Sequence, residues 1–478
     1  MNMKYYNTLS LVILATSLSG CMKIGWHQDL NRCHNAQKEL AQLTPQCCDL
    51  RDATLDEFLH IAEQRNLDLM VKQQEIDFQH EIATGEKFQM IPNLFSNSEF
   101  SERNNIPGSA SQSLVPGVPP APPSVSSEKQ VKRWDFSLTW NIMDFGISYF
   151  RSRQEANREI IQMIEWNRLR QNLITDVTRN YWQAVMAQKA VNELRELIQK
   201  LQNHHLKLEK NSERKWISRT LILENQQRVI EMQMILEEQK REYDTAIEEL
   251  KRLLGIVVPN DKIQLRDITY DSIDVTFPNI EELEKLSLRY RAELHVQDIQ
   301  EKVDIDEVRA AFLEMFPGIS IFGAENQDKN KFLLHNEWLT YGIRTSWDLF
   351  AIPYHLKRIS ASNARQVLTE KNRLSLAMAV IAQVNIAYWL FQHDREQYLL
   401  SKEMESVKLS LADEALKRRN VGQYDEADVL RYEVQSMEAR VRALTAYSDM
   451  QVSLEQINNA IGIPRYLRTK EFCKITSN

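Results

Sequence analysis

Hydrophobic and polar residues alternate one by one between positions 134 and 142, within the sequence VKRWDFSLTWNIM at 131–143. The large apolar side chains take every second position: Trp134, Phe136, Leu138, Trp140 and Ile142. Only an extended strand turns a period of two into one apolar face and one polar face. The alternation recurs at 338–349, with Leu339, Tyr341, Ile343 and Trp347 in the apolar positions. We expect two strands with an apolar face each.

The segment after the first strand predicts helices of unusual length. The 108 residues from 147 to 254 contain neither glycine nor proline, whereas average composition would place about a dozen of the two there. A helix from Gly146 to a turn near Lys215 would reach about 100 Å at ~1.5 Å per residue. No ordinary globular domain therefore flanks the strand, so its apolar face must lie against other strands, against lipid, or against both.

The second half of the chain repeats the first half. Adding 207 to the residue number carries Trp140 to Trp347 and Tyr181-Trp182 to Tyr388-Trp389. It also carries Leu254-Gly255-Ile256 to Ile461-Gly462-Ile463. Upstream, Pro92 and Pro317 differ by 225, so the loop between the strands is 18 residues (225 − 207) shorter in the second half. The pattern predicts a duplicated helix–strand–strand–helix unit.

These patterns divide the chain into segments. The fold class is mainly α with a small β part. The first helix of repeat 1 begins at Leu55, where Thr54 and Glu57 form a capping box, and it runs toward Pro92. The expected segments are a signal peptide 1–20, an irregular N-terminal arm 21–53, repeat 1 at 54–260 (strands 93–103 and 131–143, long helices 147–254), repeat 2 at 261–464 (strands 318–326 and 338–349, long helices 354–461) and a C-terminal tail 465–478.

Repeat 2 shows how the long helices turn back. Val421-Gly422-Gln423-Tyr424 contains the only glycine between Gly342 and Gly462. After it, apolar residues step by 4, 3, 4 and 3, the heptad spacing of a coiled-coil seam. They are Leu430, Val434, Met437, Val441 and Leu444. We expect a helical hairpin in each repeat.

The strands of one chain cannot satisfy all of their backbone hydrogen bonds with one another. Four strands are too few to close a barrel, and open edges cannot lie in lipid, so several copies must combine. Three copies would give twelve strands, enough for a water-filled lumen. Tryptophans near the strand ends would then form an aromatic girdle; they are Trp134, Trp140, Trp338 and Trp347.

The N-terminus indicates export. Lys4, the apolar run from Leu9 to Ala15 and the sequence Leu18-Ser19-Gly20-Cys21 are typical of a secretory signal. Leu-Ser-Gly-Cys resembles the bacterial lipobox, in which the cysteine is acylated; the alternative is an ordinary signal peptide that ends near a cysteine. Export places the other cysteines in an oxidising compartment, where a disulfide is expected but its connectivity cannot be deduced. They are Cys33, Cys47, Cys48 and Cys473.

Composition and motifs exclude several function classes. The formal net charge of −7 gives no basic footprint for nucleic acid. His204 and His205 are adjacent in a helix and point about 100° apart, so they cannot clamp one metal ion together. No phosphate loop, zinc-protease motif or nucleophile elbow is present. We expect no enzyme, no cofactor and no metal site.

The chain resembles the TolC family of outer-membrane channel proteins, the outer membrane factors, over residues of about 55–465. The resemblance rests on the duplication with its 207 spacing and on three short motifs. These are Trp140-Asn141-Ile142-Met143-Asp144-Phe145-Gly146, its echo Trp347-Asp348-Leu349-Phe350, and Val421-Gly422 ahead of Asp428-Val429-Leu430. With Cys21 as the lipid attachment site, the chain is similar to the lipoprotein branch of that family.

The resemblance implies a homotrimer whose 12-stranded transmembrane β-barrel continues as a long periplasmic α-helical barrel. Such a channel lies in outer-membrane lipid, is lipid-anchored, and extends into the periplasm. It takes cargo from an inner-membrane pump through a periplasmic adaptor, in tripartite efflux or type I secretion. The expected membrane-facing residues are Trp134, Phe136, Leu138, Trp140, Tyr341, Ile343 and Trp347. The alternative is a structural periplasmic coiled-coil lipoprotein tethered to the outer membrane.

The resemblance also assigns the far end of the helices. The adaptor-facing tip would comprise Val421, Gly422 and Tyr424 in repeat 2 and Lys215 and Trp216 in repeat 1.

The same resemblance predicts a periplasmic gate at Asp428 and Arg431, with arginine at a position where the family has a second acid. Independently, three-fold symmetry would bring three Asp428 carboxylates around one axis, where they would favour cations. Arg431 would then pair with Asp428 either between chains or as an i, i+3 surface pair.

Overall fold

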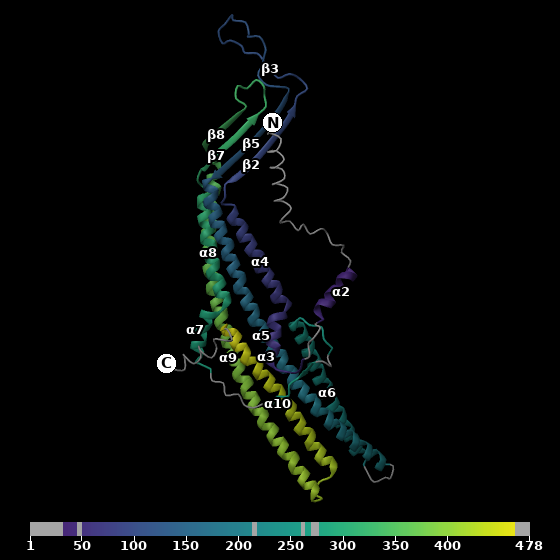
Figure 1. The fold of residues 1–478 in the computed structure, drawn as a ribbon. Helices are drawn as coiled ribbons and strands as arrows, with labels where there is room; N and C mark the ends of the chain where they lie inside the picture. Colours follow the sequence, from purple (N-terminus) through teal and green to yellow (C-terminus); the bar gives the residue numbers. More distant parts are fainter. Residues whose placement is uncertain (1–31, 45–49, 213–217, 260–262, 269–276, 464–478) are drawn as a thin grey trace.

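The computed structural model describes residues 32–44, 50–212, 218–259, 263–268 and 277–463. Figure 1 shows a long, narrow molecule with its main sheet at one end and two helical hairpins at the other. The helices are α2 (Arg32–Leu43), α3 (Leu55–Arg65), α4 (Leu67–Phe88), α5 (Ile142–Ser212), α6 (Arg219–Leu254), α7 (Ile280–Tyr290), α8 (Ala292–Leu313), α9 (Ile352–Asn420) and α10 (Glu426–Ile461), with a 3₁₀ turn η2 at Leu349–Ala351. The strands are β1 (Leu50–Ala53), β2 (Asn93–Glu102), β3 (Gly108–Ser109), β4 (Ser124–Val125), β5 (Gln130–Asn141), β6 (Ile263–Leu265), β7 (Gly318–Asp328) and β8 (Glu337–Ser346).

Element boundaries repeat with the offsets that the sequence predicts. α6 and α10 both have 36 residues, and they start 207 positions apart (426 − 219). α4 and α8 both have 22 residues and start 225 positions apart (292 − 67). The difference of 18 falls between the strands, because the β2–β5 loop is longer than the β7–β8 loop. The duplication of the chain is therefore confirmed.

One antiparallel sheet in the order β2-β5-β7-β8 forms the upper end of the molecule. Leu138 of β5 pairs with Leu94 of β2 on one side and with Gly323 of β7 on the other. Gly323 in turn pairs with Tyr341 of β8. β2 and β8 are the edges of this sheet among the described residues.

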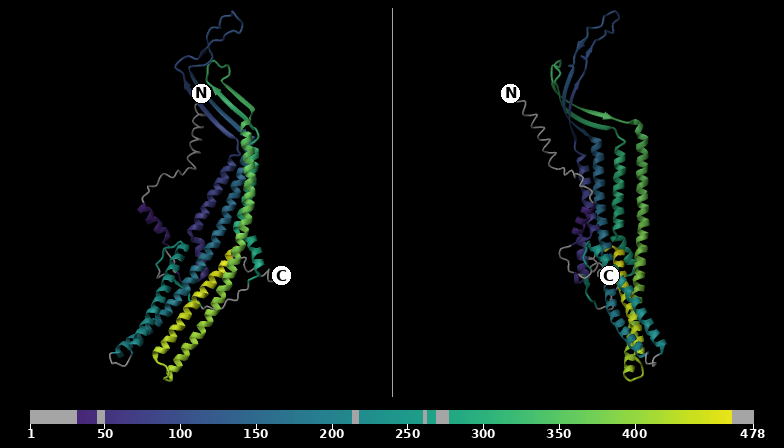
Figure 2. Two further views of the ribbon diagram at one scale, coloured as in Figure 1. Left: turned by 180° about the vertical axis from the view of Figure 1, so that it is seen from behind. Right: turned by 90° about the vertical axis from the view of Figure 1, so that its right-hand side faces the viewer.

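The helices continue the sheet as one row. Next to the sheet, α4 packs on α5, α5 on α8, and α8 on α9. Farther away, α6 packs on α5, α5 on α10, and α10 on α9. α5 and α9, with 71 and 69 residues, run through both halves, as the side view in Figure 2 shows. Each of these long helices is matched by shorter helices stacked end to end.

The shorter helices meet at two equivalent junctions, one in each repeat. The side chain of Asn66 caps α4 by accepting from the Leu69 amide at 2.9 Å. The same side chain donates to the Leu253 carbonyl at the end of α6, also at 2.9 Å. In repeat 2, Arg291 donates from Nη1 to the Ala460 carbonyl at 3.2 Å. Leu253 and Ala460 lie 207 positions apart and are therefore equivalent in the two repeats. The two repeats bind this equivalent carbonyl with different side chains.

Two predictions about local structure were wrong. The arm is not irregular throughout, because it contains α2, and β1 pairs in parallel with β6 at Leu50 and Ile263. The helix that begins at Leu55 does carry the predicted capping box of Thr54 and Glu57. It breaks at Asn66, however, because that residue adopts an extended conformation to cap α4.

The strands before the long helices end earlier than predicted. β5 stops at Asn141, whose Oδ1 accepts from the Met143 amide at 3.1 Å and so starts α5 at Ile142. β8 stops at Ser346, because the Asp348 carboxylate accepts from the Phe350 amide at 3.0 Å and caps η2. Ile142 and Trp347 therefore lie outside the strands. Both ends are set by a polar side chain that captures backbone amides.

The glycine at the repeat 1 junction leads to a stability prediction. Gly255 has a left-handed backbone (φ 63°), and a Cβ there would lie 2.6 Å from the Arg65 carbonyl oxygen. We expect Gly255→Ala to lower the free energy of unfolding by more than about 2 kcal/mol. Gly85→Ala is the control, since a Cβ at Gly85 meets nothing within 4 Å and alanine favours a helix by about 1 kcal/mol. Thermal unfolding followed by circular dichroism measures both, and equal midpoints would contradict the prediction.

Candidate functional site

The register of the main sheet collects large apolar side chains on one face. Trp140 pairs with Ile321, which pairs with Ile343, so the three side chains point to the same side. Leu138 pairs with Gly323, which pairs with Tyr341, so the side chains of Leu138 and Tyr341 point to that side as well. We call this set the apolar face: Leu94, Trp134, Phe136, Leu138, Trp140, Ile321, Leu339, Tyr341 and Ile343. Tyr341 is 86% exposed and Ile343 is 72% exposed in the protomer, so none of the described elements covers this face there.

The opposite face of the sheet is mainly polar. Asn97 donates to Asp135 across the β2–β5 pair at 2.8 Å, and Asn326 donates to Thr340 across β7–β8 at 3.1 Å. Trp338 pairs with Asn326 and therefore lies on this polar face. It is one residue out of phase with Leu339 and so does not share a face with Trp134 and Trp140, while the aromatic girdle stays a prediction. Polar residues of the face are Asp135, Ser137, Thr139, Asn141, Ser320, Asn326, Thr340 and Arg344.

The turn between α9 and α10 forms one extreme end of the molecule (Figure 1). Gly422 has φ +77°, and its amide donates to the Arg419 carbonyl at 2.9 Å, which ends α9. Tyr424 stacks on Tyr432 with ring centroids 6.3 Å apart, and its hydroxyl accepts from Arg418 at 3.3 Å. Val421 is 70% exposed. These contacts fix the conformation of the turn and leave one apolar side chain exposed on its surface.

The predicted gate residues cap a helix in the protomer. Asp425 is the N-cap of α10, and Asp428 forms the reciprocal capping box with it. Arg431 donates from Nη2 to the Asp428 carboxylate at 3.2 Å. The i, i+3 pair therefore exists within one chain, while the gate role stays a prediction.

Ion pairs between α5 and α10 could not be predicted from the sequence. His204 is buried, and its Nδ1 lies 3.5 Å from Glu426; burial lowers the pKa of this imidazole. Lys207 lies 3.3 Å from the same carboxylate. Nearer the middle, Arg440 of α10 binds Glu193 of α5 and, at 2.8 Å, Glu405 of α9. No pattern in the sequence places the residues of α5 beside those of α10, because the two helices are more than two hundred positions apart.

The junction of repeat 2 contains an ion pair whose arginine, Arg291, is only 4% exposed. It is more deeply buried than the charged groups of the ion pairs between α5 and α10. Glu293 lies 3.1 Å from Arg291 and 2.9 Å from Arg168, so one carboxylate serves two guanidinium groups. Burial lowers the pKa of both arginines, and that of Arg291 is lowered further by the charge of Arg168. Arg291 also donates to Gln383 of α9 at 2.6 Å. The junction thus binds α5, α8, α9 and α10 to one another.

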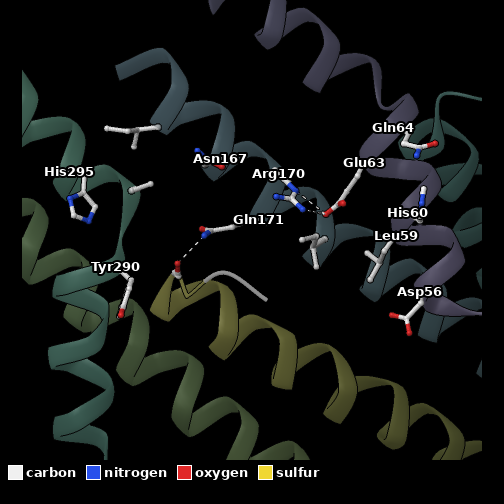
Figure 3. Close-up of a pocket in the computed structure, with 14 residues that line it drawn as sticks. Asp56, Leu59, His60, Glu63, Gln64, Asn167, Arg170, Gln171, Tyr290 and His295 are labelled. Atoms are coloured by element: carbon white, nitrogen blue, oxygen red, sulfur yellow. Dashed lines mark hydrogen bonds and ion pairs between the residues drawn. The ribbon is translucent and has the colours of Figure 1, made fainter. Parts of the chain in front are cut away.

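An open pocket of about 920 Å³ lies beside the same junction, between α3 and the start of α8 (Figure 3). Two interactions join residues of its lining: Arg170 donates to Glu63 at 2.9 Å, and Gln171 donates to the Gly462 carbonyl at 2.9 Å. The residues that the structure describes contain no cluster of three or more groups suited to a metal ion. We therefore assign the pocket to packing.

Several predicted site residues fall outside the described part of the chain. Cys21, Lys215 and Trp216 belong to this group, so neither the lipid attachment site nor the repeat 1 tip is described. The same applies to Cys47, Cys48 and Cys473 and to the side chain of Cys33. Cys21 acylation, the repeat 1 tip and a disulfide remain predictions.

Known proteins share the fold at low sequence identity. No family model and no curated protein sequence matches the chain. The outer-membrane channel OprN superposes with a TM-score of 0.69 at 15% identity, covering 89% of this chain and 95% of that one. The Campylobacter jejuni CmeC outer membrane channel gives 0.69 at 14%, covering 88% and 89%. The open-state Neisseria gonorrhoeae MtrE outer membrane channel gives 0.64 at 16%, covering 88% and 94%. The chain therefore has the fold of the TolC-type outer-membrane channels.

Proposed function

We propose that this protein is a passive exit channel: a homotrimer whose sheets join into a 12-stranded barrel in the outer membrane. The main observation that supports this proposal is the apolar face, which is exposed in the protomer and belongs to a sheet with two open edges. Lipid tolerates no unpaired edge, so β8 of one copy must pair with β2 of the next. The polar face then lines a water-filled lumen.

The edges of the helical row support the same assembly. α9 is the one helix among the described residues with an 18-residue stretch apolar enough, by length and composition, to cross a membrane. Its exposed side chains beside α8 include Val367, Leu374 and Met378, and α4 at the other edge exposes Val71 and Phe78. In the trimer we propose, α9 of one copy packs on α4 of the next, which removes both apolar surfaces from water.

The proposed channel extends from the outer membrane into the periplasm. Its helical barrel receives cargo there from an inner-membrane pump through a periplasmic adaptor, in efflux or type I secretion. Acylation of Cys21 anchors it to lipid. The similarity to the CmeC and MtrE channels supports the exit role, and the continuous row of long helices supplies the reach.

Membrane extraction and surface labelling test the proposal against a periplasmic coiled-coil lipoprotein. A channel stays in the membrane after salt and alkaline washing, and a cysteine placed at Ser113, in the exposed β2–β5 loop, reacts with an impermeant reagent on whole cells. A scaffold never exposes that loop to the outside. Failure of labelling in a washed membrane that still holds the protein would favour the scaffold.

The exposed turn of repeat 2 leads to a prediction on the adaptor. Val421→Asp places a charge on the one exposed apolar side chain of the turn, so we expect the adaptor recovered after crosslinking in cells to fall about tenfold. Thermal stability should not change, because the side chain is 70% exposed. Ser113→Asp at the opposite end is the control. Undiminished adaptor recovery with Val421→Asp would contradict the proposed tip.

A further inference from the structure

The apolar face ends in a row of lysines at the end of the sheet farthest from the long helices. Lys132 pairs with Phe100, two residues beyond Trp134 on the same face. The Lys329 amide donates to the Lys132 carbonyl at 3.0 Å, which places Lys329 beside Lys132 in the same row. Going outward along β5, the face therefore changes from Leu138 and Phe136 to Trp134 and then to two ammonium groups, while Glu325, Gln327 and Glu337 lie beside them on β7 and β8.

Both ammonium groups lie over aromatic rings. Lys329 Nζ lies 4.7 Å from the centroid of Trp134, and Lys132 Nζ lies 5.5 Å from that of Phe100. Such contacts hold the charges at a fixed height on the sheet while leaving N–H donors for a ligand. Tryptophan and lysine in this order are typical of the boundary between hydrocarbon and headgroups.

The lysine row opens into a pocket of about 770 Å³. Four lysines line it against two carboxylates, Glu102 and Glu128. Lys331 pairs with Glu128 at 3.1 Å. One row inward, Glu337 accepts from Gln327, so that carboxylate already has a donor. The pocket keeps a net positive charge; its lysines are Lys129, Lys132, Lys329 and Lys331.

We propose that this pocket binds the phosphate groups of an outer-leaflet glycolipid, with its acyl chains on the apolar face. The inference rests on the proposed function, because that function puts the lysine row at headgroup level. The chemistry fits: a phosphate needs several N–H donors and positive charge, while the acyl chains need the large apolar side chains of β5 below the lysines, which are Trp134, Phe136 and Leu138. Three copies would give the barrel a belt of such sites.

The test uses the purified full-length trimer in detergent and two probes: lipid A with both phosphates, and the same lipid after dephosphorylation. We expect the wild type to bind the phosphorylated probe at least tenfold more tightly. The double variant Lys132→Gln/Lys329→Gln should lose about 30-fold in affinity for that probe, since each lysine near anionic lipid contributes about 1 kcal/mol. Its affinity for the dephosphorylated probe should not change.

Lys285→Gln/Lys302→Gln, on exposed positions of α7 and α8, removes the same charge elsewhere and should bind like the wild type. Equal binding of the two probes by the wild type, or equal losses in both double variants, would overturn the inference. The comparison of the two lipid probes on the wild-type protein tests the inference even if a variant fails to fold. Displacement of the lipid by millimolar inorganic phosphate would show a free-anion site instead, and would also overturn it.

Conductance keeps this inference separate from the proposed function. A wild-type protein that conducts in a bilayer of zwitterionic lipid but shows no phosphate preference contradicts only the lipid site. A protein that never conducts in any lipid contradicts the channel itself.

Discussion

Leu138→Arg is expected to abolish stable insertion into the outer membrane, whereas Thr139→Arg is expected to leave it intact. The residues are neighbours in β5, but Leu138 lies on the apolar face beside Leu94, and Thr139 lies on the polar face. An arginine that faces lipid costs about 2–4 kcal/mol near the bilayer midplane, and a trimer would carry three of them. An arginine in a wet lumen costs little. The fraction of protein that resists alkaline washing measures the effect.

The pair of variants is self-controlled, because each introduces one arginine at adjacent positions of the same strand. Loss of insertion in both variants would show that β5 tolerates no arginine on either face. It would then give no support to the assignment of lipid to one face of the sheet and water to the other. Equal insertion of both would contradict the lipid-facing role of the apolar face.

Arg291→Ala is expected to lower the free energy of unfolding by about 3 kcal/mol, the cost of breaking a buried ion pair from one side. The change removes the donors to the Asn459 and Ala460 carbonyls and to Gln383, and it leaves Glu293 with only Arg168. The midpoint of thermal unfolding, followed by helical circular dichroism, measures the loss.

The duplicated repeat supplies a conservative variant for this site. Arg291→Asn installs the residue type that repeat 1 uses at Asn66, where it caps the helix and holds the Leu253 carbonyl. We expect it to recover part of the stability lost in Arg291→Ala. Lys285→Ala, at an exposed position of α7, should have no effect. Arg291→Ala with wild-type stability would show that the junction does not hold the repeats together.

The sequence predicted the parts of the fold that depend on local periodicity. A period of two is a property of neighbouring residues, so Phe136 and Leu138 could be placed on one face before any pairing was known. The offset of 207 could be counted along the chain, and the second helices of the two hairpins, α6 and α10, begin and end on it. Long helices followed from the absence of glycine and proline.

Features that depend on distant partners could not be predicted in this way. The break at Asn66 contains no glycine or proline; it is fixed by a carbonyl 187 positions away. β1 and β6 have four and three residues, too few to show a period. The lysine row needs the register of β5 against the β7–β8 loop, which places Lys329 beside Lys132.

Crosslinking between edge strands tests the central claim most directly. One cysteine replaces Ser96 in β2, and a second replaces Leu339, Tyr341 or Ile343 in β8, in a background with Cys33, Cys47, Cys48 and Cys473 changed to serine. All four positions lie on the same side of the sheet as the apolar face. If three copies close one barrel, oxidation in membranes yields a covalent trimer for at least one pair. Monomers with every pair, or an open ladder of larger species, would contradict the closed trimeric barrel.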